Sequence, residues 1–149
     1  MQAPKPILIH VERTVPVSPE EAFDAWLNPD IARRFFFATD TGEMVTAEID
    51  PQVGGKFLMV DRRNGEDAAH GGVYDVIDRP RQIAFTFSVP PDSPEKTRVI
   101  LDFLAQNGGC LVSLTHELHP NWASQEENVR NGWKTMLEKL STTLQEPGR

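Results

Sequence analysis

The chain has 149 residues, the size of one globular domain, which is long enough to bury a hydrophobic core of its own. Its 22 acidic and 15 basic residues give a net charge of −7, so the protein repels the phosphates of nucleic acids and anionic lipid headgroups. A single cysteine excludes an internal disulfide framework, and no apolar run approaches the roughly 20 residues that span a bilayer. We therefore expect one domain over residues 1–149, located in the cytoplasm, with neither nucleic acid nor a membrane as partner.

The N-terminal part predicts one strand and two short helices. Ile7 to Val17 alternates β-branched apolar residues with polar ones, which is typical of a strand. Ser18 to Glu21 supplies a capping hydroxyl, a proline for the first helical turn and a capping-box glutamate. Asn28 to Asp30 repeats the cap and the proline, so a second helix should begin there and end near Phe35. The first helix should bury Ala22, Phe23, Trp26 and Leu27.

Six further strands are predicted after residue 42, separated by turns rich in glycine, proline and asparagine. Short turns between sequential strands favour an antiparallel meander. Thr39 to Gly42 could be a loop or the edge of a strand. The six predicted strands are Glu43–Ile49, Lys56–Asp61, Gly72–Ile77, Gln82–Val89, Arg98–Ala105 and Cys110–Leu118.

A long helix is predicted at the C-terminus. Ser124 to Glu127 reads as a capping box, and the helix should run to about Gln145, which gives it a length of about 30 Å. An apolar stripe of this length needs a sheet to lie on, so the chain should be an α+β protein. The stripe consists of Val129, Trp133, Met136, Leu137, Leu140 and Leu144.

Several stretches resemble one known group of proteins. They are Glu12-Arg13, Ser18–Trp26 with Asn28-Pro29, Ile49–Pro51 with Gly54–Phe57, Gly72–Pro80 with Ile83–Phe87, and Gly132-Trp133 with Leu137 and Leu140. On these stretches the chain resembles the SRPBCC superfamily, and within it the family related to the activator of heat shock protein 90 ATPase. The resemblance implies the helix-grip fold of START-like and Bet v 1-like domains. In that fold a curved antiparallel sheet of six or seven strands wraps around a long C-terminal helix, and two short helices follow strand 1.

Metal and nucleophile chemistry find little support in the sequence. His116, Glu117 and His119 are close together, but the two histidines are three residues apart at a strand end, where they face opposite sides. The H-E-x-x-H pattern of zinc sites instead needs a spacing of four on a helix. Cys110 follows a Gly-Gly turn with no histidine beside it, so we expect an inert thiol on a buried or edge strand. Gly54 to Lys56 lacks the rest of a phosphate loop and predicts a hairpin turn. We expect no metal, no cofactor and no catalytic residue.

The aromatic run Phe35-Phe36-Phe37 cannot be buried on one helix face. At least one ring should therefore point elsewhere, either into the mouth of a cavity or into an exposed patch. Ordinary core packing is the alternative. An exposed patch would favour a homodimer, so both monomer and homodimer stay open.

Methionine and aromatic side chains suit an adaptable apolar pocket between helix and sheet, although they also suit a plain core. The period of two places Phe85 and Phe87 on one face, and Tyr74 with Val76 on one face. Tyr74, His116 and His70 would be polar contacts for a ligand, if His116 faces inward rather than solvent. The predicted ligand-binding residues are Phe36, Phe37, Met59, Tyr74, Phe85, Phe87, His116, Trp133 and Met136.

Three functions follow as hypotheses. The first is the binding of a small hydrophobic or aromatic ligand. Gly132 would give room beside Trp133, either to the sheet or to a pocket. The second, implied by the resemblance, is a chaperone-cofactor role, although the members that activate the chaperone carry an additional N-terminal domain. The third, implied by the wider superfamily, is cyclase or hydrolase chemistry, for which Tyr74 and His116 would be the acid–base pair.

Overall fold

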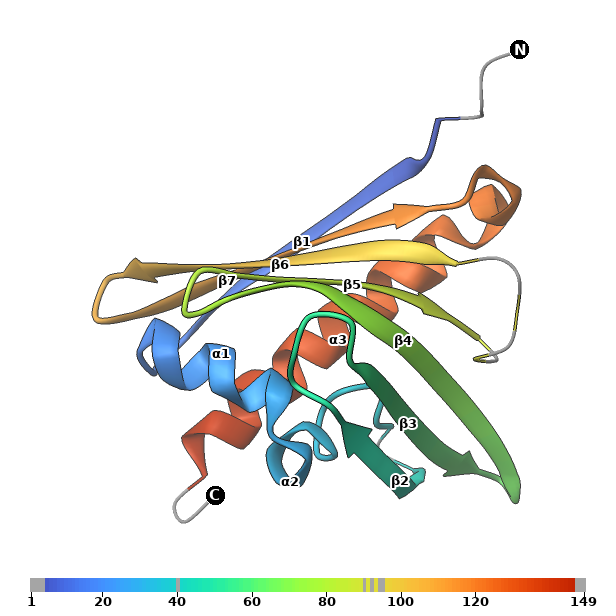
Figure 1. Cartoon of the computed structure of the whole chain (residues 1–149), viewed down its shortest axis with the longest axis horizontal. Coiled ribbons are helices and arrows are strands. Elements are labelled where there is room, and N and C mark those ends of the chain that lie inside the picture. Colours follow the sequence, from blue (N-terminus) through green and yellow to red (C-terminus); the bar gives the residue numbers. More distant parts are fainter. Residues whose placement is uncertain (1–4, 40, 90, 92, 94–95, 147–149) are drawn as a thin grey trace.

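A seven-stranded antiparallel sheet curves around one long helix in the computed structural model, which describes residues 5–39, 41–89, 91, 93 and 96–146 (Figure 1). The strand order is β1-β7-β6-β5-β4-β3-β2, so the meander β2–β7 is completed by the first strand, which pairs with the last. The elements are β1 Ile7–Val15, α1 Pro19–Leu27, α2 Pro29–Ala32, β2 Glu43–Ile49, β3 Lys56–Arg63, β4 Glu66–Asp78, β5 Gln82–Ser88, β6 Thr97–Gln106, β7 Gly109–Leu118, the 3-10 helix η1 Pro120–Gln125, and α3 Glu126–Gln145. The predicted α+β helix-grip fold is confirmed.

The two short helices begin where the capping residues predicted. The Ser18 hydroxyl accepts a hydrogen bond from the Glu21 amide at 3.2 Å, and the Asn28 side-chain oxygen accepts one from the Asp30 amide at 3.0 Å. Both satisfy backbone donors that a helix start leaves unpaired. The second helix is shorter than predicted, because it ends at Ala32 and a series of turns follows.

The third capping prediction is wrong. Ser124 lies inside η1, which begins after His119, and α3 starts at Glu126 without a side-chain cap. The reason is that Pro120 opens a 3-10 helix that leads directly into α3. The α3 amides that Ser124 was expected to cap therefore follow an existing helical turn.

Strand β4 begins six residues earlier than predicted. Its first half contains Ala68, Ala69, Gly71 and Gly72, which have weak strand propensity, so the sequence pattern alone left this part out. Pairing with the whole length of β3, across the turn at Asn64 and Gly65, overrides that propensity. A β-bulge between Tyr74 and Val76 then shifts the alternation, so that Ile77, instead of the predicted Val76, packs against the core beside Tyr74.

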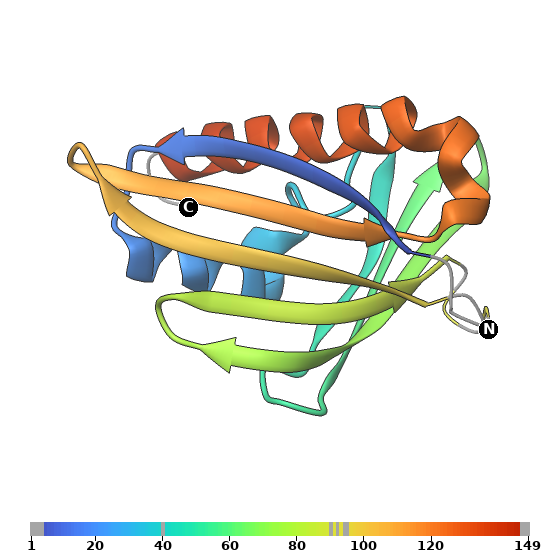
Figure 2. The same cartoon turned by 90° about the horizontal axis from the view of Figure 1, so that it is seen from above.

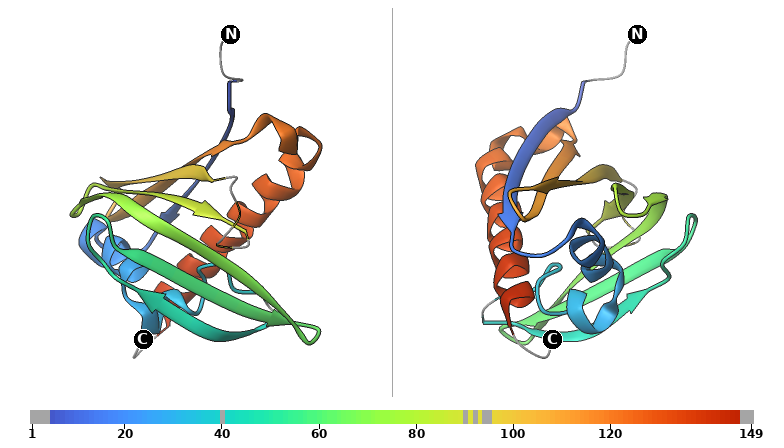
Figure 3. Two further views of the ribbon diagram at one scale, coloured as in Figure 1. Left: turned by 45° about the vertical axis from the view of Figure 1, so that its right-hand side comes forward. Right: turned by 90° about the vertical axis from the view of Figure 1, so that its left-hand side faces the viewer.

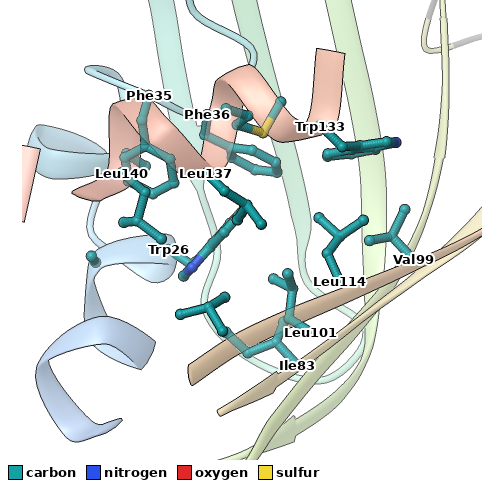
Figure 4. Close-up of a cluster of buried hydrophobic side chains, with 14 of the residues drawn as sticks. Trp26, Phe35, Phe36, Ile83, Val99, Leu101, Leu114, Trp133, Leu137 and Leu140 are labelled. Carbon is teal, nitrogen blue, oxygen red and sulfur yellow. The ribbon is translucent and has the colours of Figure 1, made fainter. Parts of the chain in front are cut away.

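The closed core lies where α1, α2 and the C-terminal half of α3 meet the sheet. Figure 3 shows α1 and α2 at the same end of the molecule as the C-terminal part of α3, and Figure 2 shows β1 running beside α3. Trp26 packs edge-on against Phe35, with ring centroids 4.9 Å apart, and lies beside Leu137 and Leu140 (Figure 4). Trp133 lies at the other end of this labelled group.

All three rings of the aromatic run are buried, with 0%, 1% and 8% of Phe35, Phe36 and Phe37 exposed. Phe35 and Phe36 pack against Trp26, whereas Phe37 has a φ of +58° that turns its ring toward His70. Phe36 and Phe37 also stack on each other, with ring centroids 4.6 Å apart. The run forms no exposed patch, and that argument for a homodimer is removed. No helix in the described part of the chain is long and apolar enough to cross a membrane.

Candidate functional site

A pocket of about 790 Å³ opens between the N-terminal half of α3 and one end of the sheet. Side chains from the loop after α2, from the ends of β3 to β7, and from η1 complete its wall. Gly132 lies on the α3 side, and a Cβ atom built on it would meet no heavy atom within 4 Å. Of the two predicted reasons for this glycine, a close approach to the sheet is absent, whereas Gly132, which is exposed, is one of the residues that line the pocket.

Aromatic rings form the apolar wall of the pocket. Phe37 stacks on His70, with ring centroids 4.2 Å apart and an interplanar angle of 8°. Phe87 meets Trp133 edge-on at 6.0 Å, and Phe37 lies 5.7 Å from the same indole. Met136 adds a flexible apolar side chain from the next turn of α3. Such a surface suits a flat, largely apolar molecule.

His116 is the centre of a polar group on the sheet side of the pocket. The indole N–H of Trp133 donates to His116 Nδ1 at 3.0 Å, and His116 Nε2 lies 2.9 Å from Thr97 Oγ1. Burial lowers the pKa of His116 to about 4, so the imidazole is neutral at physiological pH. Thr97, His116 and Trp133 thus form one hydrogen-bonded series that runs from β6 through β7 to α3.

A second polar group lies at the β3–β4 end of the pocket. Arg63 donates through Nε to Asp61 Oδ2 at 2.9 Å and through Nη2 to the Phe37 carbonyl at 3.2 Å. The Thr39 hydroxyl donates to the same Asp61 oxygen at 2.7 Å. Burial, together with the charge of Arg63, lowers the pKa of His70 to about 4. Among the described residues no partner is present for Nδ1 of His70.

The pocket brings together five of the nine predicted ligand-binding residues: Phe37, Phe87, His116, Trp133 and Met136. The other four, Phe36, Met59, Tyr74 and Phe85, are buried in the core next to the pocket but do not line it. Tyr74 packs against Phe57 and Phe85, and burial raises the pKa of its hydroxyl. Of the predicted Tyr74–His116 pair, only His116 therefore reaches the pocket wall.

Several polar residues of the pocket were not predicted from the sequence, among them Thr39, Arg63 and Thr97. For Arg63 and Thr97, the alternation of inward and outward residues along a strand could have predicted an inward-facing side chain. Arg63 continues the inward alternation of Phe57, Met59 and Asp61 along β3, and Thr97 lies two residues before the buried Val99 on β6. Thr39 lies in an irregular loop, where no periodicity could have placed it.

The side chains considered for metal or nucleophile chemistry do not gather into a site. His116 points inward, whereas Nδ1 of His119 accepts the Asn121 amide at the start of η1. Across the described residues no group of three or more His, Cys, Asp or Glu side chains could hold a metal ion. Cys110 is buried on β7, as predicted, and burial raises the pKa of its thiol.

Comparison with known proteins gives a family match and a set of similar folds. The sequence model of the family described as "Activator of Hsp90 ATPase homolog 1-like protein" matches residues 16–145. No curated protein matches the chain.

Three solved structures illustrate the similarity of fold. A protein from Chromobacterium violaceum is 22% identical with a TM-score of 0.80, over 93% of this chain and 96% of that one. A protein from Nitrosomonas europaea is 16% identical with a TM-score of 0.81, over 93% and 94%. An AHSA1-like protein from Aeromonas hydrophila is 18% identical with a TM-score of 0.80, over 93% and 92%. At these identities the likeness shows the fold alone.

Proposed function

We propose that this chain, which belongs to the family of proteins like the activator of Hsp90 ATPase homolog 1 and has the helix-grip fold of the SRPBCC superfamily, binds a small hydrophobic or aromatic molecule. The observation that carries the proposal is the pocket of about 790 Å³ between α3 and the sheet. Its volume lies within the range of small-molecule sites, roughly 300–1,000 Å³. Its wall combines stacked aromatic rings with a few hydrogen-bonded polar groups, which is the usual composition of such sites.

Gly132 gives independent support. Glycine inside a helix costs about 1 kcal/mol relative to alanine, so its presence in α3 has no benefit for the helix itself. Gly132 is exposed and is one of the residues that line the pocket, so a large side chain at this position would reduce the volume left for a ligand. Keeping a binding pocket open would explain a glycine at this position, whereas helix stability does not.

The proposal can be tested with N-phenyl-1-naphthylamine, a neutral aromatic probe whose fluorescence increases in apolar surroundings. Trp122 and Trp133 line the pocket and Trp26 does not, so binding should also change the intrinsic tryptophan emission. Gly132→Phe should fill the pocket and abolish saturable binding. Thr142→Phe places the same side chain on an exposed position of α3 outside the pocket, and it should leave binding unchanged.

Two results would contradict ligand binding in this pocket. One is the absence of saturable binding by the probe and by a panel of other apolar aromatics, measured also as thermal stabilisation. The other is equal binding by wild type and Gly132→Phe, which would place the bound probe elsewhere. Native mass spectrometry of the purified protein would identify any molecule retained from the host.

A second candidate is a chaperone-cofactor role, which is favoured by the match to the family of proteins like the activator of Hsp90 ATPase homolog 1. Its test is a pull-down and an ATPase assay with the Hsp90 of the same host. If the protein neither binds Hsp90 nor changes its ATPase rate, the chaperone-cofactor role is refuted. Acid–base catalysis by Tyr74 and His116 has less support, because Tyr74 does not line the pocket and Trp133 occupies Nδ1 of His116.

A further inference from the structure

We infer that the molecule held in this pocket carries a hydrogen-bond acceptor, such as the carbonyl oxygen of an aromatic ketone, which accepts the hydroxyl proton of Thr97. The inference rests on the proposed function and makes its ligand class more specific. It follows from the direction in which the hydrogen bonds of Trp133, His116 and Thr97 must run.

The direction is fixed at the indole. A tryptophan Nε1–H can donate but cannot accept, so His116 Nδ1, 3.0 Å away, must be the acceptor. The imidazole is buried and neutral, so its one proton has to be on Nε2. Nε2–H then donates to Thr97 Oγ1 at 2.9 Å, and the Thr97 hydroxyl is left with its own proton to donate.

Two other hydroxyl groups of the pocket, those of Thr39 and Ser88, use their protons within the protein. The Thr39 hydroxyl donates to Asp61 Oδ2, and the Ser88 hydroxyl donates to the Pro91 carbonyl at 2.9 Å. Thr135 on α3 is exposed, so water can pair with it. Thr97 is half-buried, and His116 is the partner that the described residues give its hydroxyl group.

Because the surroundings of Thr97 are apolar, the affinity for a ligand should depend on whether the ligand accepts a hydrogen bond from the Thr97 hydroxyl group. Thr97 is paired in register with Phe87, whose ring centroid lies 5.3 Å from that of His116 and 6.0 Å from that of Trp133 in the apolar wall. A ligand that displaces water from this wall leaves the Thr97 hydroxyl without a partner unless the ligand supplies an acceptor. An unpaired donor in apolar surroundings weakens binding, whereas a paired one strengthens it. The flat rings beside it favour an aromatic body for the same ligand.

The test compares 9-fluorenone with fluorene, which share one ring system and differ in the carbonyl oxygen. The dissociation constants of both are measured by isothermal titration calorimetry for wild type, Thr97→Val and Thr97→Ser. Thr97→Val keeps the shape and removes the hydroxyl. The two compounds differ in hydrophobicity, so the measured quantity is the change in their affinity ratio between variants. We expect the ratio to shift against fluorenone by about fivefold in Thr97→Val and to stay near wild type in Thr97→Ser.

A second variant tests the direction of the hydrogen bonds while keeping Thr97. Trp133→Phe removes the donor to His116 Nδ1, so the imidazole proton can move to Nδ1 and Nε2 can accept from Thr97. The Thr97 proton would then point to His116, and the preference for fluorenone should fall as it does in Thr97→Val. A merely structural role of Trp133 would change both affinities and leave their ratio constant.

The outcomes separate this inference from the proposed function. If both compounds bind and their ratio is the same in wild type, Thr97→Val and Trp133→Phe, the inference is overturned and the pocket remains a binding site. If N-phenyl-1-naphthylamine binds to the wild-type protein but neither fluorenone nor fluorene does, the inference is overturned and the proposed function stands. If none of the three binds, and the wider panel fails as well, both fail together. A ratio that changes in both variants and recovers in Thr97→Ser supports the inference.

Discussion

Replacing Gly132 with alanine should stabilise the protein and leave its pocket open. Gly132 lies in the interior of the 20-residue helix α3, where glycine costs about 0.8–1.0 kcal/mol relative to alanine. A Cβ atom at this position meets no heavy atom within 4 Å, so no clash opposes the gain. The expected increase in the free energy of unfolding is therefore about 1 kcal/mol, which corresponds to a rise in Tm of about 2–4 °C at this chain length.

Urea denaturation followed by far-UV circular dichroism measures the effect, with an unchanged m-value as a check that the unfolding transition is the same. Gly65→Ala is the matched control. A Cβ atom on Gly65 also meets nothing within 4 Å, but its φ of +81° is unfavourable for alanine. Gly65→Ala should therefore destabilise the protein by about 1–2 kcal/mol, although both positions offer the same free space.

A loss of stability in Gly132→Ala would refute the reasoning. It would mean that α3 lies closer to the sheet in solution than the open space beside Gly132 implies, and the pocket volume would then be overestimated. The same variant should also keep its affinity for N-phenyl-1-naphthylamine, because a single methyl group occupies little of the pocket.

Two further predictions concern buried titratable groups. Burial lowers the pKa of His116 to about 4, so His116 binds a proton more tightly in the unfolded chain than in the folded protein. The neutral, buried imidazole should therefore contribute fully to the free energy of unfolding above about pH 6.5. Between pH 7 and pH 5 this contribution should fall by about 2 kcal/mol. Urea titrations should show a smaller loss in His116→Gln than in the wild-type protein, and equal losses in the two proteins would contradict the assignment. Asp61→Asn should destabilise the protein by about 2–4 kcal/mol, because a carboxylate that is 1% exposed loses its ion pair with Arg63. Asp67→Asn removes an exposed ion pair on the same hairpin and should have little effect; a similar loss in both variants would refute the importance of burial.

The order of the elements could be predicted because it is encoded locally. Ser18 and Asn28 cap their helices with hydrogen bonds to amides two or three residues away, and Asn64-Gly65 supplies the positive φ angles of a tight turn. Ser124 shows the limit of such signals. It has the right neighbours for a capping box, but the preceding Pro120 had already started another helix.

Membership of the pocket depends on features that residue type does not reveal. Phe36 and Phe37 are identical and adjacent, and their rings stack 4.6 Å apart, yet Phe37 lines the pocket and Phe36 does not. Phe37 has a φ of +58°, a backbone conformation that residue type does not predict. Tyr74 is buried among Phe57 and Phe85 and does not reach the cavity. A bulge follows it on β4, and alternation along a strand cannot locate a bulge.

The pairing of the strands nevertheless determines where the pocket lies. At one end of the inner face the sheet carries aliphatic residues in register, such as Leu101 opposite Leu114, and α1 and the C-terminal half of α3 cover that end. Two residues further along the same face, Val99 lies opposite His116, and the next inward position of β6 is Thr97. If leucine side chains covered His116 and Thr97, the polar atoms of these two residues that now face the pocket would be buried without hydrogen-bond partners, which costs free energy. The inner face therefore changes from packed core to lined pocket at this level of the sheet, and following the inward positions across paired strands would locate the change.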